Sequence, residues 1–315
     1  MNVRTLDNRL LPAIVIAAIF VTLPIFFPSA YYFRIGALVF MSALAVVGLN
    51  LLMGFAGQVS LGHAGFLGIG AYSVAIGPVH FGLPSWLSLF GGAILSGTIA
   101  FLVGRPILRL KGHYLAVATL GFGILVAIVL TNEANWTGGP DGMSVPKLVL
   151  FSWQVRKSEV WYWIAGTTLI GGMVLALNLK ESPTGRALQA IHDSEIAASV
   201  LGIDVTQKKL TIFVTSAVYA SVAGSYLALF NGHVTPDSAG FLRSIELVTM
   251  VVLGGMGSIV GSLVGAAMLV VLPQVLTIFH EYEQALLGLI LMVFMIFLRR
   301  GIVPSVAATF VGLRK

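Results

Sequence analysis

The chain has 315 residues, of which 57% are hydrophobic and only 10% are charged. So few charges cannot cover the surface of a water-soluble protein of this size, which excludes a soluble globular fold and indicates an integral membrane protein. The absence of cysteine excludes disulfide bonds, thiol catalysis and cysteine-bound metals. The net charge of +6 does not indicate nucleic-acid binding, because Lys and Arg stand at the ends of apolar runs and not on one soluble face.

Continuous apolar runs follow one another along the chain, and none alternates in the way of a membrane-barrel strand. About 20 apolar residues cross the roughly 30 Å of hydrocarbon as a helix. The expected fold class is therefore all-α, with residues 1–315 forming a single transmembrane domain of about ten spans, within a range of eight to ten. The expected spans are 10–28, 34–53, 63–81, 84–103, 113–131, 160–179, 209–231, 243–256, 257–278 and 284–299.

The first and the eighth of these runs differ from the others. The first follows basic residues like a signal peptide, but Pro28-Ser-Ala30 is a poor cleavage site, so a retained helix is expected. The eighth run is short enough to be tilted, broken or re-entrant.

The basic residues predict the orientation in the membrane. With ten crossings and both termini in the cytoplasm, thirteen of the eighteen Lys and Arg residues fall on the inner side, as the positive-inside rule requires. This arrangement places a long loop, 132–159, outside the membrane and a polar segment, 180–209, in the cytoplasm. The outer loop is rich in turn-forming residues, and we expect either contact with an external partner or a cap anchored at the membrane interface by Trp136, Trp153 and Trp161.

Small residues recur at helical spacing inside two apolar runs. Gly257, Gly261 and Gly265 repeat every four residues, and Ser216, Ala220, Gly224 and Ala228 do the same. Such stripes let helix backbones approach closely, so packing within the bundle is expected, with helix self-association as the alternative. The pairs Gly54/Gly57 and Gly254/Gly257 lie 200 residues apart and suggest a weak internal duplication or a chance match.

Sequence motifs for catalysis are missing. No phosphate-binding loop of the form Gly-x-x-x-x-Gly-Lys-Ser/Thr occurs, nor does His-Glu-x-x-His or Gly-x-Ser-x-Gly. We therefore expect no catalytic residue, metal or cofactor in the chain itself. The spans also lack the buried carboxylates on which ion-coupled transporters depend, so the energy for transport is expected to come from another subunit.

The polar 180–209 segment is the feature that a simple pore would not need. Residues 181–204 carry several charges, Pro183 favours the start of a helix, and the spacing of Ala187, Ile191, Glu195 and Ala198, with Val200, Leu201 and Ile203, predicts a short amphipathic helix before Gly202. Such a helix lying beneath the membrane could receive force from a soluble partner.

These residues carry a resemblance to a known family. Ile196-Ala-Ala-Ser-Val-Leu-Gly202 resembles the Glu-Ala-Ala-x-x-x-Gly coupling motif of ABC importer permeases, with Ile196 at the Glu position and Glu195 one residue earlier. Further segments are similar to the LivM-type permease subunits of high-affinity branched-chain amino acid importers. They are Gly48-Leu-Asn-Leu-Leu-Met-Gly-Phe-Ala-Gly-Gln-Val-Ser-Leu-Gly-His-Ala-Gly-Phe66, Trp136-Thr-Gly-Gly-Pro-Asp-Gly142, Ser182-Pro-Thr-Gly-Arg-Ala-Leu-Gln-Ala-Ile-His192 and Gly254-Gly-Met-Gly-Ser258.

This resemblance implies the fold of a large ABC importer permease in a bacterial inner membrane, and a set of partners. They are a LivH-like permease paralogue, two cytoplasmic ATPase subunits that bind the ATP, a periplasmic or lipid-anchored substrate-binding protein, and membrane lipid. It further implies a coupling role for residues of the cytoplasmic segment, namely Arg186, His192, Glu195, Ala197, Ala198 and Gly202.

Polar residues near glycines in the second and third runs are the candidates for the substrate path. Asn50, Gln58, Ser60 and His63 could bind a zwitterion without a fixed charge. Each also has a structural interpretation: Asn50 and Gln58 could bridge helices, Ser60 could cap the next helix, and His63 could sit at the membrane interface.

The expected function is translocation of Leu, Ile or Val delivered by a binding protein and driven by partner ATPases. An ABC permease for urea or short-chain amides shares much of the motif set and is the first alternative. A passive channel is the second. A secondary symporter is disfavoured by the missing carboxylates.

Overall fold

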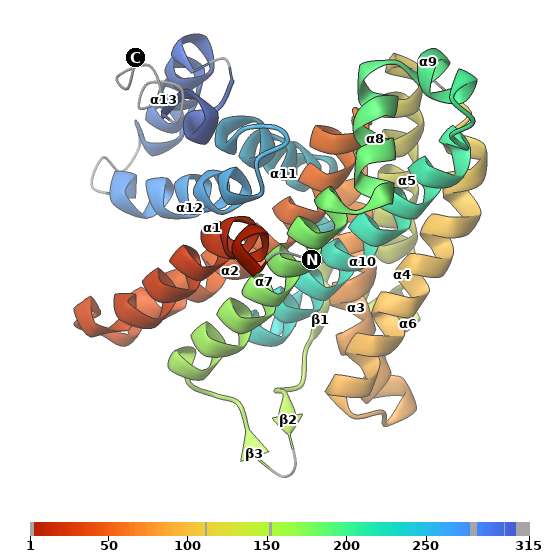
Figure 1. The fold of residues 1–315 in the computed structure, drawn as a ribbon. Helices are drawn as coiled ribbons and strands as arrows, with labels where there is room; N and C mark the ends of the chain where they lie inside the picture. The colour runs from red at the N-terminus through yellow and green to blue at the C-terminus, as the bar shows by residue number, and fades with distance from the viewer. Residues whose placement is uncertain (1–2, 111, 151–152, 278–281, 299, 307–315) are drawn as a thin grey trace.

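The computed structural model describes the chain except for residues 1–2, 111, 151–152, 278–281, 299 and 307–315 (Figure 1). The expected cytoplasmic placement of the two ends of the chain thus lies outside the described residues. Within the described part, the helices are α1 (Val3–Thr22), α2 (Ala30–Asn50), α3 (His63–Phe81), α4 (Ser85–Ile107), α5 (His113–Asn132), α6 (Ala134–Thr137), α7 (Ser158–Glu181), α8 (Pro183–Asp193), α9 (Glu195–Val200), α10 (Val205–Asn231), α11 (Phe241–Gly254), α12 (Ile259–Leu276) and α13 (Glu283–Phe297).

The remaining elements are short. Three 3₁₀ turns and one π turn occur in the described residues: η1 (Leu23–Phe26), the π turn η2 (Leu51–Phe55), η3 (Gly139–Asp141) and η4 (Pro236–Ala239). Strand β1 (Met143–Ser144) pairs antiparallel with β4 (His233–Val234), and β2 (Val149–Leu150) pairs antiparallel with β3 (Trp153–Gln154).

Seven helical stretches of the described chain are long and apolar enough to cross a membrane. They are Ala30–Phe55, His63–Phe81, Ser85–Ile107, His113–Asn132, Ser158–Glu181, Val205–Asn231 and Ile259–Leu276. Two shorter apolar helices lie at Pro12–Phe26 and Ala285–Phe297, and α11 has 14 residues, or about 21 Å of helix at 1.5 Å per residue. The all-α, multi-pass membrane fold is confirmed, whereas the count of about ten crossings stays a prediction.

The centre of the bundle is formed by α2, α3 and α10. In the most apolar window of the stretch containing α2, 83% of residues are buried, compared with 28% for α4 and 22% for α5, which lie at the periphery. Small residues explain the close contact of α3 with α10, because a Cβ on Gly224 would lie 1.9 Å from the Leu67 carbonyl oxygen. The predicted packing stripe on α10 is thereby confirmed.

The glycine stripe at 257–265 is only partly helical. A Cβ on Gly261 would meet the Gly254 carbonyl oxygen at 2.4 Å, and one on Gly265 would meet that of Met250 at 1.9 Å, so both glycines pack α12 against α11. Gly257 instead lies before α12 with φ +77°, a conformation that ends a helix. It contacts Gly54, so the two glycine-rich segments that lie 200 residues apart in sequence meet in space.

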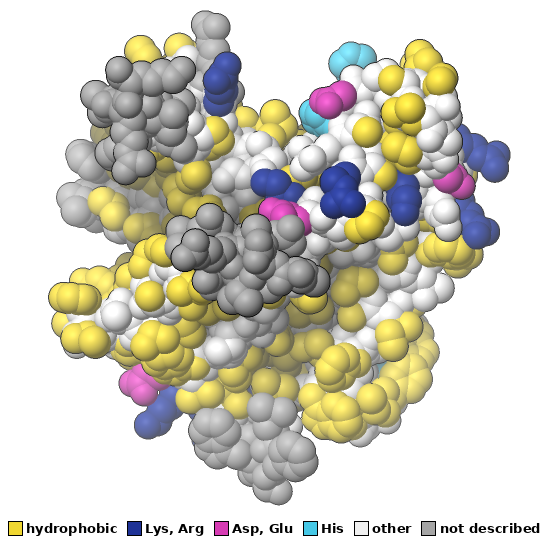
Figure 2. All heavy atoms as spheres, viewed as in Figure 1, with side chains coloured by type: hydrophobic (Ala, Val, Ile, Leu, Met, Phe, Trp, Pro, Cys, Tyr) yellow, Lys and Arg dark blue, Asp and Glu magenta, His cyan; other side chains and the backbone are white. Residues whose placement is uncertain are grey.

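The two polar parts of the chain lie at opposite ends of the bundle. Figure 1 shows α8 and α9 at the top and strands β2 and β3 at the bottom. On the face drawn in Figure 2, charged side chains gather over the α8–α9 end and hydrophobic side chains cover much of the flank below. Trp161 was one of three tryptophans in the alternative of a cap anchored at the interface. It is buried, 2% exposed, against Tyr226 and Phe230 of α10.

Candidate functional site

The helical chain is broken between α2 and α3, in a loop that is partly buried against the bundle. The π turn Leu51–Phe55 ends α2, Gly57 adopts φ +66°, and α3 begins only at His63. The buried residues of this break leave backbone N–H groups that need partners. Neighbouring helices supply them, since Leu61 N donates to Thr119 Oγ1 of α5 at 3.1 Å and Ala64 N donates to Ser244 Oγ of α11 at 3.1 Å.

Polar side chains without partners concentrate in this break. Gln58, Ser60 and His63 are 3%, 1% and 0% exposed. In the part of the chain that the structure describes, eight buried side-chain polar atoms lack a hydrogen bond, and five of them belong to these three residues. The His63 ring lies close to the backbone of Ser216, but without a well-formed hydrogen bond. Burying such groups unpaired is costly, so this segment is held in a state suited to receive a polar ligand or water.

Asn50 differs from the other three residues because both polar atoms of its side-chain amide form hydrogen bonds. Nδ2 donates to the Ser258 carbonyl at 2.8 Å and to Ser262 Oγ at 2.9 Å, while Oδ1 accepts from Gly257 N at 2.8 Å. The side chain is 0% exposed. Asn50 therefore braces the end of α2 to the start of α12, in agreement with its helix-bridging interpretation.

Three of the structural interpretations of the break are wrong. The residue that precedes α3 is Gly62, without a side-chain cap, and Ser60 Oγ makes no hydrogen bond, so Ser60 does not cap the helix. His63 does not sit at an interface, because its side chain is fully buried beside Phe66. Gln58 also bridges no helices by hydrogen bonds.

The 180–209 segment folds into two short helices instead of one. Ser182 Oγ accepts from Gly185 N at 3.1 Å and starts α8, Ser194 Oγ accepts from Ala197 N at 3.2 Å and starts α9, and Asp204 Oδ1 accepts from Gln207 N at 3.0 Å and starts α10. The helical pattern predicted across Ser194 is broken there, because Ser194 is extended with ψ 113° and caps the second helix.

One face of this segment is packed against the bundle. Leu188, Ile191 and Ala198 are 1%, 2% and 1% exposed. Glu195, at the start of α9, forms an ion pair with Lys209 of α10, whose side chain is 5% exposed. The exposed Arg186 donates from Nη1 to the Glu181 carbonyl at 2.8 Å. The segment is therefore attached to both α7 and α10.

The same segment contacts the helix break. A Cβ on Gly57 would lie 2.8 Å from His192 Nδ1, so the imidazole sits directly against the turn. Gln58 lines a cavity of about 230 Å³ together with Glu195 and Lys209. The structure thus brings three of the residues that were predicted separately as coupling and path residues to the same turn: His192, Glu195 and Gln58.

The outer face of α9 is apolar and exposed. Ile196, Val200 and Leu201 are 76%, 82% and 77% exposed. Val200 and Leu201 were predicted on the apolar face of an amphipathic helix, and in the structure they are exposed. Ala197 is also exposed, and Gly202 follows with φ +79° and no atom within 4 Å of a Cβ. An exposed apolar patch at the tip of a polar segment is typical of a protein–protein contact. We call Ile196, Val200 and Leu201 the α9 patch.

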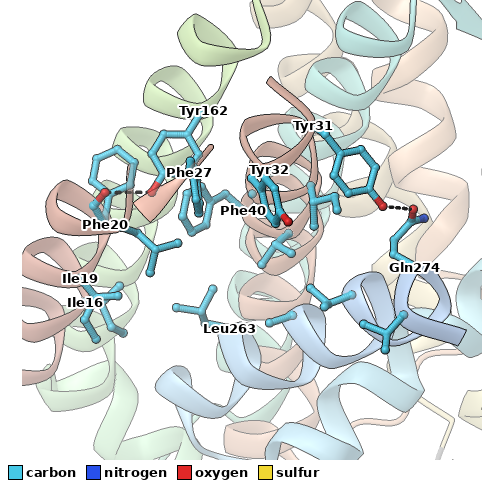
Figure 3. Close-up of a pocket in the computed structure, with 17 residues that line it drawn as sticks. Ile16, Ile19, Phe20, Phe27, Tyr31, Tyr32, Phe40, Tyr162, Leu263 and Gln274 are labelled. Atoms are coloured by element: carbon cyan, nitrogen blue, oxygen red, sulfur yellow. Dashed lines mark hydrogen bonds between the residues drawn. The ribbon is translucent and has the colours of Figure 1, made fainter. Parts of the chain in front are cut away.

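A second cavity, of about 500 Å³, lies among α1, α2, α7 and α12 and is almost entirely apolar (Figure 3). In Figure 3 the Tyr31 side chain points to Gln274, and its hydroxyl donates to Gln274 Oε1 at 3.0 Å. This lining contains no charged side chain to bind the ends of a zwitterion, so the helix break is the better candidate for a path.

Comparison with known proteins assigns the family. Residues 31–297 match the family described as "Branched-chain amino acid transport system / permease component". The chain belongs to this family. The resemblance on which the sequence interpretation depended is confirmed.

The chain is similar to permease proteins named LivM and LivH. The high-affinity branched-chain amino acid transport system permease protein LivM of Salmonella typhimurium is 36% identical over 282 residues, and LivM of Escherichia coli K12 is 35% identical over 282 residues. Each match covers 82% of this chain and 66% of the relative. LivH of Salmonella typhimurium is 29% identical over 279 residues, covering 80% of this chain and 88% of LivH. No solved structure matches the chain.

Sequence reasoning missed three parts of this site. It did not identify Lys209 as the ion-pair partner of Glu195, the contact of His192 with Gly57, or the exposure of the α9 patch. Lys209 carried a usable signal, because a lysine at the start of an apolar run needs a partner if it is to be buried. The other two depend on how α8 and α9 pack, which no local pattern reports.

Proposed function

We propose that the chain is a permease subunit of an ABC importer for branched-chain amino acids in a bacterial cytoplasmic membrane, with both termini inside. Family membership supports the substrate class. The observation that carries the mechanism is the contact between the 180–209 segment and the helix break at 57–63, because it joins an exposed docking surface to the unpaired polar groups of the bundle.

In this proposal the 180–209 segment is the coupling segment. The α9 patch docks on one of two cytoplasmic ATPase subunits, which supply the ATP hydrolysis for which this chain has no sequence motif. Because α8 and α9 are tied to α7 and α10 by packing and by the Glu195–Lys209 pair, movement of the ATPases shifts these helices together. Arg186, Ala197, Ala198 and Gly202 shape and hold the segment.

The path in this proposal runs along Gln58, Ser60 and His63. When the coupling segment moves, His192 pushes or releases the turn at Gly57, and the polar groups of the loop turn toward the cargo. Unpaired polar groups suit this task because they can exchange water for an amino acid without first breaking protein hydrogen bonds. Asn50 holds α2 to α12 and provides the fixed point of the movement.

The remaining partners follow the same proposal. A LivH-like paralogue completes the permease pair, and a periplasmic or lipid-anchored binding protein docks at the β1–β4 end. That end is a firm surface, because the loop 132–159 is pinned by the Met143–Val234 and Ser144–His233 pairing. Membrane lipid covers the peripheral helices.

Reconstitution tests the function. The chain is assembled with its paralogue, ATPases and binding protein in vesicles, and uptake of labelled leucine, urea and acetamide is measured with and without ATP. We expect ATP-dependent uptake of leucine alone. Uptake of urea in place of leucine would overturn the substrate class. Uptake by this chain without ATPase subunits would indicate a passive channel, and uptake that depends on an ion gradient at constant ATP would indicate a symporter.

A further inference from the structure

A third cavity opens at the β1–β4 end of the bundle, opposite the coupling segment. Its volume is about 520 Å³, and it lies among α2, α3, α10, η4, α11 and α12. This size is within the range of small-molecule sites, which typically measure about 300–1,000 Å³. Its position is set by the chain: Asn231 ends α10, β4 and η4 form one rim, and the first turns of α11 form the other.

The rim of the cavity carries charges of both signs. Arg243 is partly buried, with 25% of its side chain exposed, and its Nη1 donates to Glu246 Oε2 at 2.6 Å. Asp237 of η4 also lines the cavity and is exposed. The rim therefore presents one guanidinium and two carboxylates.

The inner walls of the cavity are mainly aliphatic, with the hydroxyl of Ser42 among them. Leu38 and Leu67 line it from α2 and α3, and Leu227 and Val270 line it from α10 and α12. The lining combines an apolar interior with a few charged groups at one edge, as in sites that bind an apolar side chain attached to a charged head.

We propose that this cavity is a receiving site for a zwitterionic amino acid with an aliphatic side chain. The guanidinium of Arg243 binds the carboxylate in a forked, charge-assisted contact, Glu246 and Asp237 bind the ammonium group, and the side chain lies against Leu38, Leu67, Leu227 and Val270. The inference rests on the proposed function and names where the bundle itself recognises the cargo. A neutral urea or amide would leave these charges without partners and would be disfavoured.

Two residues that line the cavity lie on the same face of α3 as His63. Leu67 and Ala71, which line it, follow His63 at i+4 and i+8 on α3, and residues at this spacing share one helix face. This face is packed against α10, because a Cβ on Gly224 would lie 1.9 Å from the Leu67 carbonyl oxygen. Cargo released from the cavity would therefore reach His63 only if α3 and α10 moved apart.

Equilibrium binding to the complete purified complex without its binding protein tests the proposal, using labelled leucine with leucinamide and isovalerate as competitors. Leucinamide lacks the carboxylate and isovalerate lacks the ammonium group. The wild type is expected to prefer leucine over each by about tenfold, the value of one charge-assisted contact. Arg243→Gln should bind leucine and leucinamide equally, and Asp237→Asn with Glu246→Gln should bind leucine and isovalerate equally.

Arg34→Gln is the matched control, since Arg34 lies near the same end but lines a different cavity. It should keep the wild-type preferences, and all variants should elute from a sizing column like the wild type. The loss of one preference at a time is a result that general damage to the fold would not produce. Preferences within twofold of wild type in both variants would overturn the receiving site. If the wild-type vesicles fail to take up leucine, the proposed function fails instead.

Discussion

The imidazole of His192 lies against the turn at Gly57, so that a Cβ on residue 57 would come within 2.8 Å of His192 Nδ1. Gly57 also has φ +66°, which a residue with a side chain adopts only at a cost. A cytoplasmic helix and a loop inside the bundle thus share one tight contact. Movement of either one must displace the other.

Gly57→Ala tests this contact. The added methyl group displaces His192 and strains the turn by about 1–2 kcal/mol, so we expect less leucine uptake per ATP hydrolysed in reconstituted vesicles. Gly171→Ala is the control, because no atom lies within 4 Å of a Cβ there, and it should transport like the wild type. A wild-type ratio of uptake to hydrolysis in Gly57→Ala would argue against transmission through this contact.

Gly202 offers a second test of the coupling segment. Gly202→Pro is incompatible with the observed φ of +79° and removes the hydrogen bond from Gly202 N to the Ser199 carbonyl. We expect hydrolysis without uptake. Gly202→Asn tolerates the left-handed conformation and should keep most of the uptake; equal loss in both variants would mean that the side chain, and not the backbone, is at fault.

The α9 patch should hold an ATPase subunit. Val200 is 82% exposed, so Val200→Asp should leave the fold intact while placing a charge in an apolar contact, which reduces recovery of the ATPases when the tagged permease is purified. Gln189→Asp, on the exposed face of α8, should not reduce it. Full recovery with Val200→Asp would show that the docking surface lies elsewhere.

Asn50 should be important for stability. Asn50→Ala leaves Gly257 N and Ser262 Oγ without their Asn50 partners, at about 1–3 kcal/mol for each buried group left unpaired, so the melting temperature in detergent should fall. Ser73→Ala removes one bond within a helix, to the Ile69 carbonyl, and should change the melting temperature far less. If both variants have the same melting temperature, the hydrogen bonds from Asn50 to the start of α12 contribute little to stability.

Gln58 and His63 should be important for uptake and not for stability. Replacing an unpaired buried polar group by an apolar one is neutral or stabilising, so Gln58→Leu and His63→Leu should melt at or above the wild-type temperature. Leucine uptake should nevertheless fall by about tenfold, the value of one hydrogen bond lost to the cargo. Unchanged uptake in both variants would remove these residues from the path.

Local patterns determined much of this protein. Hydropathy located the long helices, because the need to satisfy backbone hydrogen bonds in lipid makes a long apolar run helical wherever it crosses the membrane. The motif around residues 196–202 and the Gly48–Phe66 segment indicated the family, and the small-residue spacing on α10 predicted its packing against α3. These features depend on residues that are close together in the sequence.

Contacts between distant residues were decided only by the tertiary structure. The same Asn50 could have lined a path, but the carbonyl of Ser258 and the N–H of Gly257 reach its amide and make it a brace. Val200 could have packed inward, but α9 turns Ala198 toward the bundle and leaves Val200 exposed. The type of a residue limits what its side chain can do. The neighbours that folding brings to it, from 208 positions away in the case of Asn50 and Ser258, decide which of these roles it takes.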